Sequence, residues 1–115
     1  MRRTPLRKLL AIVLLTIVFV ATAFTPSARS ANLVSGAKLF TANCSACHMG
    51  GSNVIIANKT LKKEALEKYS MDSLEAIRTQ IIKGKNAMPA FGHRLSETQI
   101  EDVASYVLGQ AEKGW

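Results

Sequence analysis

Apolar residues recur at spacings of three and four in four stretches of the chain, the pattern of helices that bury one face. These stretches are residues 33–44, 61–69, 72–84 and 96–111. No segment alternates apolar and polar residues with the period of two that a half-buried strand requires. The pattern therefore predicts an all-α fold.

Each predicted helix has an inner face that the spacing identifies. In chain order the inner residues are Leu33, Ala37, Phe40 and Cys44; Leu61, Ala65, Leu66 and Tyr69; Leu74, Ile77, Ile81 and Ile82; and Ile100, Val103, Ala104, Val107 and Ala111. Asp72, with Glu75 three residues later, is expected to cap the third helix, and Gly84 to end it. Ser96 and Gln99 have the spacing of a capping box at the start of the last helix.

The segment GKNAMPAFGHRL, between the third and fourth helices, is predicted to be an irregular loop because Gly84, Pro89 and Gly92 interrupt any helix. Proline disfavours the α conformation at the residue before it. Met88 is therefore expected to be extended and to hold its side chain out from the backbone.

The N-terminal residues have the composition of a secretory signal peptide. Four basic residues come before a long apolar run: Arg2, Arg3, Arg7 and Lys8. The run, residues 9–24, has the length of a signal-peptide core and is shorter than the roughly 20 residues that cross a bilayer. A small-x-small cleavage sequence, Ala-Arg-Ser, follows at residues 28–30. We therefore expect residues 1–30 to be removed on export and residues 31–115 to form one domain; an uncleaved membrane anchor is the alternative.

The charge of the chain does not favour a nucleic-acid partner. The formal charge is +7, but five of the 15 Lys and Arg residues fall in residues 1–30, whereas all eight acidic residues come later. Residues 31–115 therefore carry only +2, with the two signs interspersed.

The two cysteines of the chain stand in the sequence CSACH, residues 44–48. A thioredoxin-like dithiol would need a preceding strand, and the pattern predicts a helix there. A zinc site would need four ligands; beyond the motif itself only His93 remains, and the adjacent Cys47 and His48 cannot easily both point inward from one helix turn. The third interpretation is covalent haem attachment, in which Cys44 and Cys47 add to the porphyrin vinyl groups and the imidazole of His48 ligates the iron. The export signal favours this interpretation, as does the need of so small a domain for a stabilising group.

Haem iron bound through His48 has a second axial position, for which the chain offers four candidates: Met49, Met71, Met88 and His93. Met49 follows the proximal ligand and cannot reach the opposite face of the ring, and Met71 is better explained as a packed residue at a helix entry. We expect Met88 to be the ligand because its loop can fold over that face; His93 and an open or water-bound position are the alternatives. A His/Met pair raises the reduction potential and fills both axial positions of the iron. Such an iron has no free position for a substrate, which favours a carrier over an enzyme. The Nδ1 of His48 needs an orienting partner, which we expect in the loop near Asn53.

Four segments, GAKLFTANCSACHMGG, KTLKKEALEKY, GKNAMPAFGHRL and QIEDVASYVLGQA, together resemble the cytochrome c6 family. The resemblance covers essentially all of residues 31–115. It implies a small cytochrome c fold around one covalently bound haem c, attached at Cys44 and Cys47. It further implies His48 and Met88 as the axial ligands of the iron. The close crossing of the first and last helices would be formed by Gly36, Phe40 and Tyr106.

The resemblance also implies a function, the transfer of electrons from the cytochrome b6f complex to photosystem I or to a respiratory oxidase, in the thylakoid lumen or the periplasm. Arg94 matches a family arginine near the exposed haem edge that is associated with docking to the photosystem, whereas His93 is interpreted as a surface residue. The expected protein is a monomeric carrier without catalysis of its own. The alternatives are a haem subunit of a membrane oxidoreductase and a peroxidase-like enzyme with an open iron position.

Overall fold

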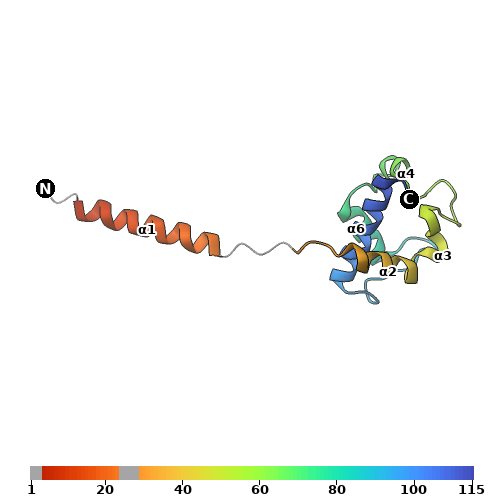
Figure 1. Ribbon diagram of the computed structural model, residues 1–115, viewed down its shortest axis with the longest axis horizontal. Coiled ribbons are helices and arrows are strands. Elements are labelled where there is room, and N and C mark those ends of the chain that lie inside the picture. Colours follow the sequence, from red (N-terminus) through yellow and green to blue (C-terminus); the bar gives the residue numbers. More distant parts are fainter. Residues whose placement is uncertain (1–3, 24–28) are drawn as a thin grey trace. The chain divides into compact units, whose positions relative to one another are not determined.

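The computed structural model describes residues 4–23 and 29–115 (Figure 1). Its helices are α1 (Thr4–Ala23), α2 (Leu33–Asn43), α3 (Ser45–His48), the 3-10 turn η1 (Met49–Gly51), α4 (Lys63–Lys68), α5 (Leu74–Lys83) and α6 (Glu97–Lys113). The described residues contain no strand, only an isolated antiparallel bridge between Lys85 and Met88. The chain divides into two compact units, Met1–Ser30 and Ala31–Trp115. The all-α prediction is confirmed.

The first unit contains α1, which includes most of the predicted signal-peptide core and exposes its apolar side chains. Residues 1–3 and 24–28 of that prediction, among them Arg2, Arg3, Phe24 and Ala28, lie outside the described residues. Among the residues that are described, no helix combines the length and the hydropathy needed to span a membrane. Cleavage after Ser30 stays a prediction.

The second unit is built around the crossing of α2 and α6 (Figure 1). A Cβ at Gly36 would lie 2.8 Å from the Cβ of Tyr106 and closer still to the carbonyl oxygen of Asp102, so only glycine permits this approach. Beside it, the ring centroids of Phe40 and Tyr106 are 5.5 Å apart. The Asp102 carboxylate, 2% exposed, accepts a 2.8 Å hydrogen bond from the Asn32 amide and ties α6 to the start of α2.

Helix α6 begins and packs as its sequence predicts. The Ser96 hydroxyl accepts a hydrogen bond from the Gln99 amide, and the Gln99 side chain accepts one from the Ser96 amide, which completes the capping box. The residues predicted to face inward are all buried: Ile100, Val103, Ala104, Val107 and Ala111. This stripe supplies half of the residues in the buried hydrophobic core.

The start of α5 differs from the prediction. Ser73, not Asp72, is its N-cap, and the Ser73 hydroxyl accepts a 3.1 Å hydrogen bond from the Ala76 amide. Serine caps a helix about as well as aspartate does, so the helix begins one residue later than expected. The end of α5 is as predicted, because Gly84 is its C-cap.

Two residues predicted on inner faces are exposed. Leu33, the first residue of α2, is 50% exposed. Ile82 is 37% exposed because α5 buries Ile77 and Ile81, and the next position points about 100° away from Ile81. The spacing therefore located both helices but not the edges of their buried faces.

The short helices and loops between the longer helices differ in extent from the prediction. The short helices α3 and η1, which the apolar pattern did not predict, carry the end of the cysteine motif and the residues after it. Helix α4 is shorter than expected, so Leu61 and Tyr69 flank it. The loop after α5 is anchored by Phe91, which is 5% exposed and whose amide donates a 2.8 Å hydrogen bond to the Ile81 carbonyl.

Candidate haem site

The cysteine motif forms a single helical turn directly after α2. The amides of Cys47 and His48 donate to the Cys44 carbonyl at 3.2 and 2.9 Å, so all three side chains project from the same turn. Both cysteines are free, with Cys44 half-buried and Cys47 exposed. Cys44 packs against the hydrophobic core, and Met88 packs against that same core from the loop after α5. The structure thus brings the predicted attachment residues together and places the predicted distal ligand against the same core.

Burial controls the chemistry of the first cysteine. Desolvation raises the pKa of the Cys44 thiol to about 11, so this sulfur is protonated at neutral pH. A dithiol catalyst or a thiolate metal ligand needs the opposite shift. The environment of Cys44 therefore fits an attachment point better than a redox or zinc site. No group of three His, Cys, Asp or Glu side chains in the described part of the chain could hold a metal ion.

The imidazole of His48 is held by a backbone carbonyl. Its Nδ1 lies 2.9 Å from the oxygen of Ser52. A carbonyl can only accept, so Nδ1 carries the hydrogen and Nε2 keeps a lone pair that can ligate a metal. The turn that carries this carbonyl is itself closed, because the Ser52 hydroxyl donates a 2.6 Å hydrogen bond to the Met49 carbonyl. The partner therefore lies in the loop that we expected, one residue before Asn53.

Asn53 has a different role, which is to fold the loop. Its side-chain oxygen accepts from the amides of Ile55 and Ile56 at 3.0 and 2.8 Å, and its side-chain nitrogen donates to the Lys59 carbonyl at 2.9 Å. These three bonds turn the chain back after the cysteine motif. The Ser52 carbonyl is thereby placed at the entrance of a well-organised loop.

The loop that follows α5 presents Met88. The amides and carbonyls of Lys85 and Met88 exchange two 3.0 Å hydrogen bonds, which close a tight turn just before Pro89. The Met88 side chain is half-buried, and its sulfur accepts a 3.7 Å hydrogen bond from the Gln80 side chain. Gln80 could not be predicted from the sequence, because a glutamine in the middle of a helix carries no signal of its own.

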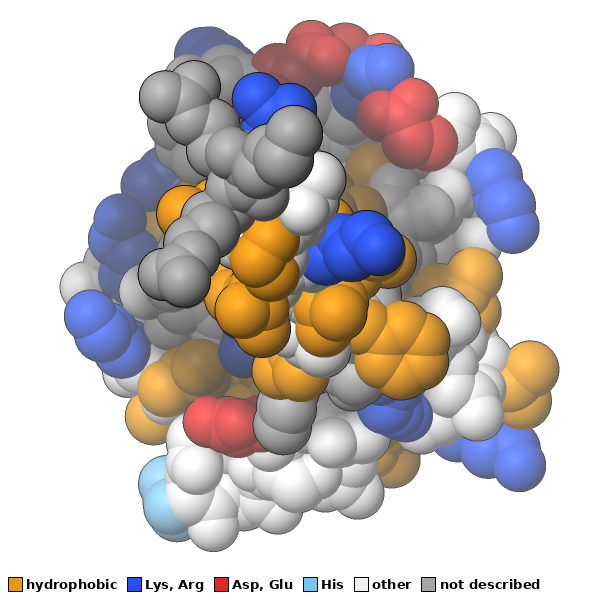
Figure 2. Space-filling view, turned by 90° about the vertical axis from the view of Figure 1, so that its left-hand side faces the viewer, with side chains coloured by type: hydrophobic (Ala, Val, Ile, Leu, Met, Phe, Trp, Pro, Cys, Tyr) orange, Lys and Arg blue, Asp and Glu red, His pale blue; other side chains and the backbone are white. Residues whose placement is uncertain are grey.

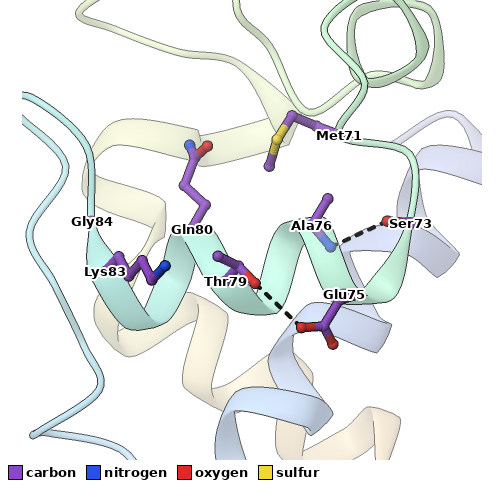
Figure 3. Close-up of a pocket in the computed structure, with 8 residues that line it drawn as sticks. All are labelled: Met71, Ser73, Glu75, Ala76, Thr79, Gln80, Lys83 and Gly84. Atoms are coloured by element: carbon purple, nitrogen blue, oxygen red, sulfur yellow. Dashed lines mark hydrogen bonds between the residues drawn. The ribbon is translucent and has the colours of Figure 1, made fainter.

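A cavity of about 520 Å³ lies along α5 on the side of Gln80. Figure 3 shows the side chains of Gln80 and Met71 projecting on the same side of this helix. Thr79 and Glu75 also line this cavity, and the Thr79 hydroxyl donates a 3.4 Å hydrogen bond to the Glu75 carboxylate. Met71 is half-buried and packs against the core, as expected for a residue that fills space at a helix entry.

The remaining candidates lie on the surface. Met49 is 71% exposed and directly follows His48. His93 and Arg94 are exposed, and the Arg94 guanidinium lies 5.7 Å from the centroid of the Phe91 ring. Stacking on a buried aromatic ring restricts the guanidinium while leaving its charge in solvent.

Comparison with known proteins finds a matching family model and several similar proteins. A family model described as cytochrome c oxidase, cbb3-type, subunit III matches residues 31–107. Cytochrome c6 of a Synechococcus species is 58% identical over 96% of this chain and 98% of its own. Cytochrome c6 of Parathermosynechococcus lividus is 65% identical over 74% of this chain and 98% of its own. The solved structure of cytochrome c6 from the diatom Phaeodactylum tricornutum is 52% identical and matches with a TM-score of 0.71, covering 73% of this chain and 99% of that one.

The residues described above fit the cofactor that these relatives imply. Two free thiols, an imidazole with an available Nε2 and a thioether sulfur are the groups that attach a haem and ligate its iron. The similarity extends over the helical second unit, whose architecture is the small cytochrome c fold. From its sequence and its fold, the chain belongs to the cytochrome c6 family of electron-carrying proteins with one covalently bound haem c.

Proposed function

We propose that this protein carries single electrons from the cytochrome b6f complex to photosystem I, with a respiratory oxidase as a further acceptor. Cys44 and Cys47 form the thioether bonds to the haem, and His48 and Met88 are the axial ligands of its iron. The observation that carries the proposal is the 2.9 Å contact between Nδ1 of His48 and the Ser52 carbonyl. It presents Nε2 as a ligand in the same helical turn as both thiols.

The haem supplies a one-electron couple, and the side chains of the chain tune and protect it. The Ser52 carbonyl fixes the imidazole of His48 and makes it a better donor to iron. The Met88 sulfur fills the second axial position, favours the ferrous state and leaves no site for a substrate. A monomeric carrier without catalysis is therefore favoured over a peroxidase-like enzyme.

Residues 1–30 act in this proposal as a signal peptide, so that the mature protein works in the thylakoid lumen or the periplasm. Two observations support this division. The first compact unit ends at Ser30, the last residue of the small-x-small sequence at residues 28–30. The relative from Parathermosynechococcus lividus matches over 85 residues, nearly its whole length, and residues 31–115 are also 85.

A haem subunit of a membrane oxidoreductase is the second candidate, favoured by the matching family model, which describes subunit III of a cbb3-type cytochrome c oxidase. The two candidates differ in how the protein is recovered after export. A carrier is released as a single chain that starts near Ala31, whereas a subunit stays with its complex in the membrane fraction. Intact mass and N-terminal sequencing of the released protein distinguish them.

The visible spectrum of the exported protein is the direct test of the proposed site. We expect sharp low-spin bands in the reduced-minus-oxidised spectrum that survive acid-solvent extraction and do not change under carbon monoxide. Covalent attachment explains the first result and two filled axial positions explain the second. A spectrum that shifts with carbon monoxide would instead indicate an open iron and support an enzyme.

Gln80→Leu should lower the reduction potential. The Gln80 amide donates to the Met88 sulfur, which draws electron density from the sulfur and favours ferrous iron. Loss of one hydrogen bond of about 1 kcal/mol corresponds to a shift of roughly 40 mV for one electron. Redox titration measures this shift.

Thr79→Val is the matched control, because Thr79 lines the same cavity and hydrogen-bonds to Glu75. An equal shift of the potential in both variants would contradict the role given to the Gln80–Met88 hydrogen bond.

Arg94→Glu should slow electron transfer to photosystem I without changing the potential. Lys and Arg side chains lie at separate places in the view of Figure 2. The Arg94 guanidinium is restrained over the Phe91 ring, and one restrained charge can matter at a small docking site. We expect the second-order rate at low ionic strength to fall by about tenfold, as for the loss of electrostatic steering. Flash-induced oxidation kinetics measure this rate. Lys38→Glu on the exposed side of α2 makes the same charge change elsewhere and should have a smaller effect. Equal rates in the two variants would remove Arg94 from the docking site.

A further inference from the structure

The C-terminal tryptophan belongs to the same part of the fold as the cysteine motif, although 67 positions separate Trp115 from His48. We propose that Trp115 is a positioning residue for the His48 imidazole, acting through the loop that carries the Ser52 carbonyl. This inference rests on the proposed ligation of the iron by His48.

The indole ring of Trp115 lies directly on Gly51. A Cβ at Gly51 would be 2.5 Å from the Cγ of Trp115 and 2.6 Å from the next two ring atoms. Gly51 also has φ +76°, in the left-handed region that side chains disfavour. Glycine thus lets the ring press against the backbone at the residue immediately before Ser52. A shift of this backbone would move the Ser52 carbonyl.

The same ring ties the far end of the loop. Its Nε1 donates a 2.9 Å hydrogen bond to the Leu61 carbonyl. The Leu61 amide in turn donates a 2.7 Å bond to the Gly51 carbonyl, which joins the two ends of the loop. One side chain therefore contacts one end of the loop and hydrogen-bonds the other.

The core fixes the position of the ring. Its centroid lies 5.2 Å from that of Phe40 on α2 and 6.2 Å from that of Tyr106 on α6. The Trp115 amide donates to the Gln110 carbonyl at 3.0 Å, so the last residue of the chain follows the end of α6. The ring thereby links the position of the loop to the rigid crossing of α2 and α6.

Without this ring, the segment that carries the Ser52 carbonyl would be restrained only by hydrogen bonds of its own loop: from the Ser52 amide and hydroxyl to the Met49 carbonyl, from the Val54 amide to the Cys47 carbonyl, and from the Leu61 amide to the Gly51 carbonyl. Such a loop can tilt as a unit. Tilting would lengthen the bond from Nδ1 of His48, and a weaker bond makes the imidazole a poorer donor to ferric iron. Loss of the ring should therefore raise the reduction potential and speed exchange of the Nδ1 hydrogen with solvent.

The test uses the haem-loaded protein and the nitrogen-bound hydrogen of His48, followed by NMR in the reduced state. Trp115→Leu removes the ring, and Trp115→Phe keeps a ring on Gly51 but removes the bond to Leu61. Ile100→Ala is the control for general destabilisation, because Ile100 is buried near the opposite end of α6. Thermal unfolding of all three variants shows how much stability each has lost.

We expect Trp115→Leu to accelerate Nδ1 exchange by roughly two- to tenfold, the factor for one net hydrogen bond, and to shift the potential upward. Trp115→Phe should lie between this variant and the parent. Ile100→Ala should lower the melting temperature and leave exchange and potential unchanged. If Trp115→Leu melts early but keeps parental exchange and potential, Trp115 is only a core residue and the inference is wrong. A parent protein without iron-bound His48 would refute the proposed ligation instead, while the exchange comparison on the same histidine would still decide the role of Trp115.

Discussion

Met88→Ala should leave the haem covalently attached and open one axial position of its iron. The proposed thioether bonds at Cys44 and Cys47 do not depend on Met88, but the alanine side chain cannot reach the metal. Reduced protein is then expected to bind carbon monoxide, and the potential to fall by on the order of 100 mV, a part of the ~0.8 V range that axial ligands command. Carbon monoxide difference spectra and redox titration measure the two effects.

Met71→Ala is the matched control for this variant. Met71 is also half-buried and borders the cavity beside Gln80, yet we explain it as packing. Its replacement should lower the free energy of unfolding, and the reduced variant should still not bind carbon monoxide. Should Met71→Ala open the iron while Met88→Ala leaves it closed, the two methionines have been assigned the wrong way round.

Gly36→Ala should destabilise the protein by about 3 kcal/mol or more, the upper part of the range for overpacking. The new methyl group would meet the Asp102 carbonyl and the Tyr106 Cβ, and neither can rotate away. Relief requires α2 and α6 to move apart along their whole contact. Denaturant unfolding of the haem-loaded protein measures the loss.

Gly109→Ala provides a control of opposite sign. Gly109 lies inside α6, and a Cβ there would meet nothing within 4 Å. Replacing a helical glycine with alanine then gains about 0.5–1 kcal/mol because the unfolded chain loses freedom. Destabilisation by both variants would point to a general intolerance of alanine and against the close crossing as the cause.

The features that sequence predicted well are those with a local cause. The capping box of Ser96 and Gln99 involves residues three apart, and the inner stripe of α6 repeats often enough to be unambiguous. At the start of α5, two adjacent residues could each act as the cap, and only the structure shows that Ser73 does so. The pattern cannot rank neighbours whose chemistry is nearly equal.

The sequence can indicate the parts of the candidate site whose chemistry lies in side chains. It cannot indicate the parts that depend on the path of the backbone or on contacts between distant residues. The cysteine motif is visible because its spacing is the signal. The partner of His48 is a backbone carbonyl, which every residue possesses, so the sequence could indicate a loop but not Ser52. The contact of Trp115 with the loop joins positions 54 residues apart, and nothing in the pattern links them.

The turn from Cys44 to Ser52 also bears on the order in which the protein is assembled. Within nine residues it holds both thiols, the imidazole and the carbonyl that orients it, and short-range hydrogen bonds close it. Closing so short a loop costs little chain entropy, so this half of the site can form before the helices have packed. Met88 comes forty positions after His48 and reaches its place only with the core. If Met88 ligates the iron as we propose, haem can be joined to a still unfolded chain, and the arrival of the methionine sulfur at the iron would then mark the end of folding.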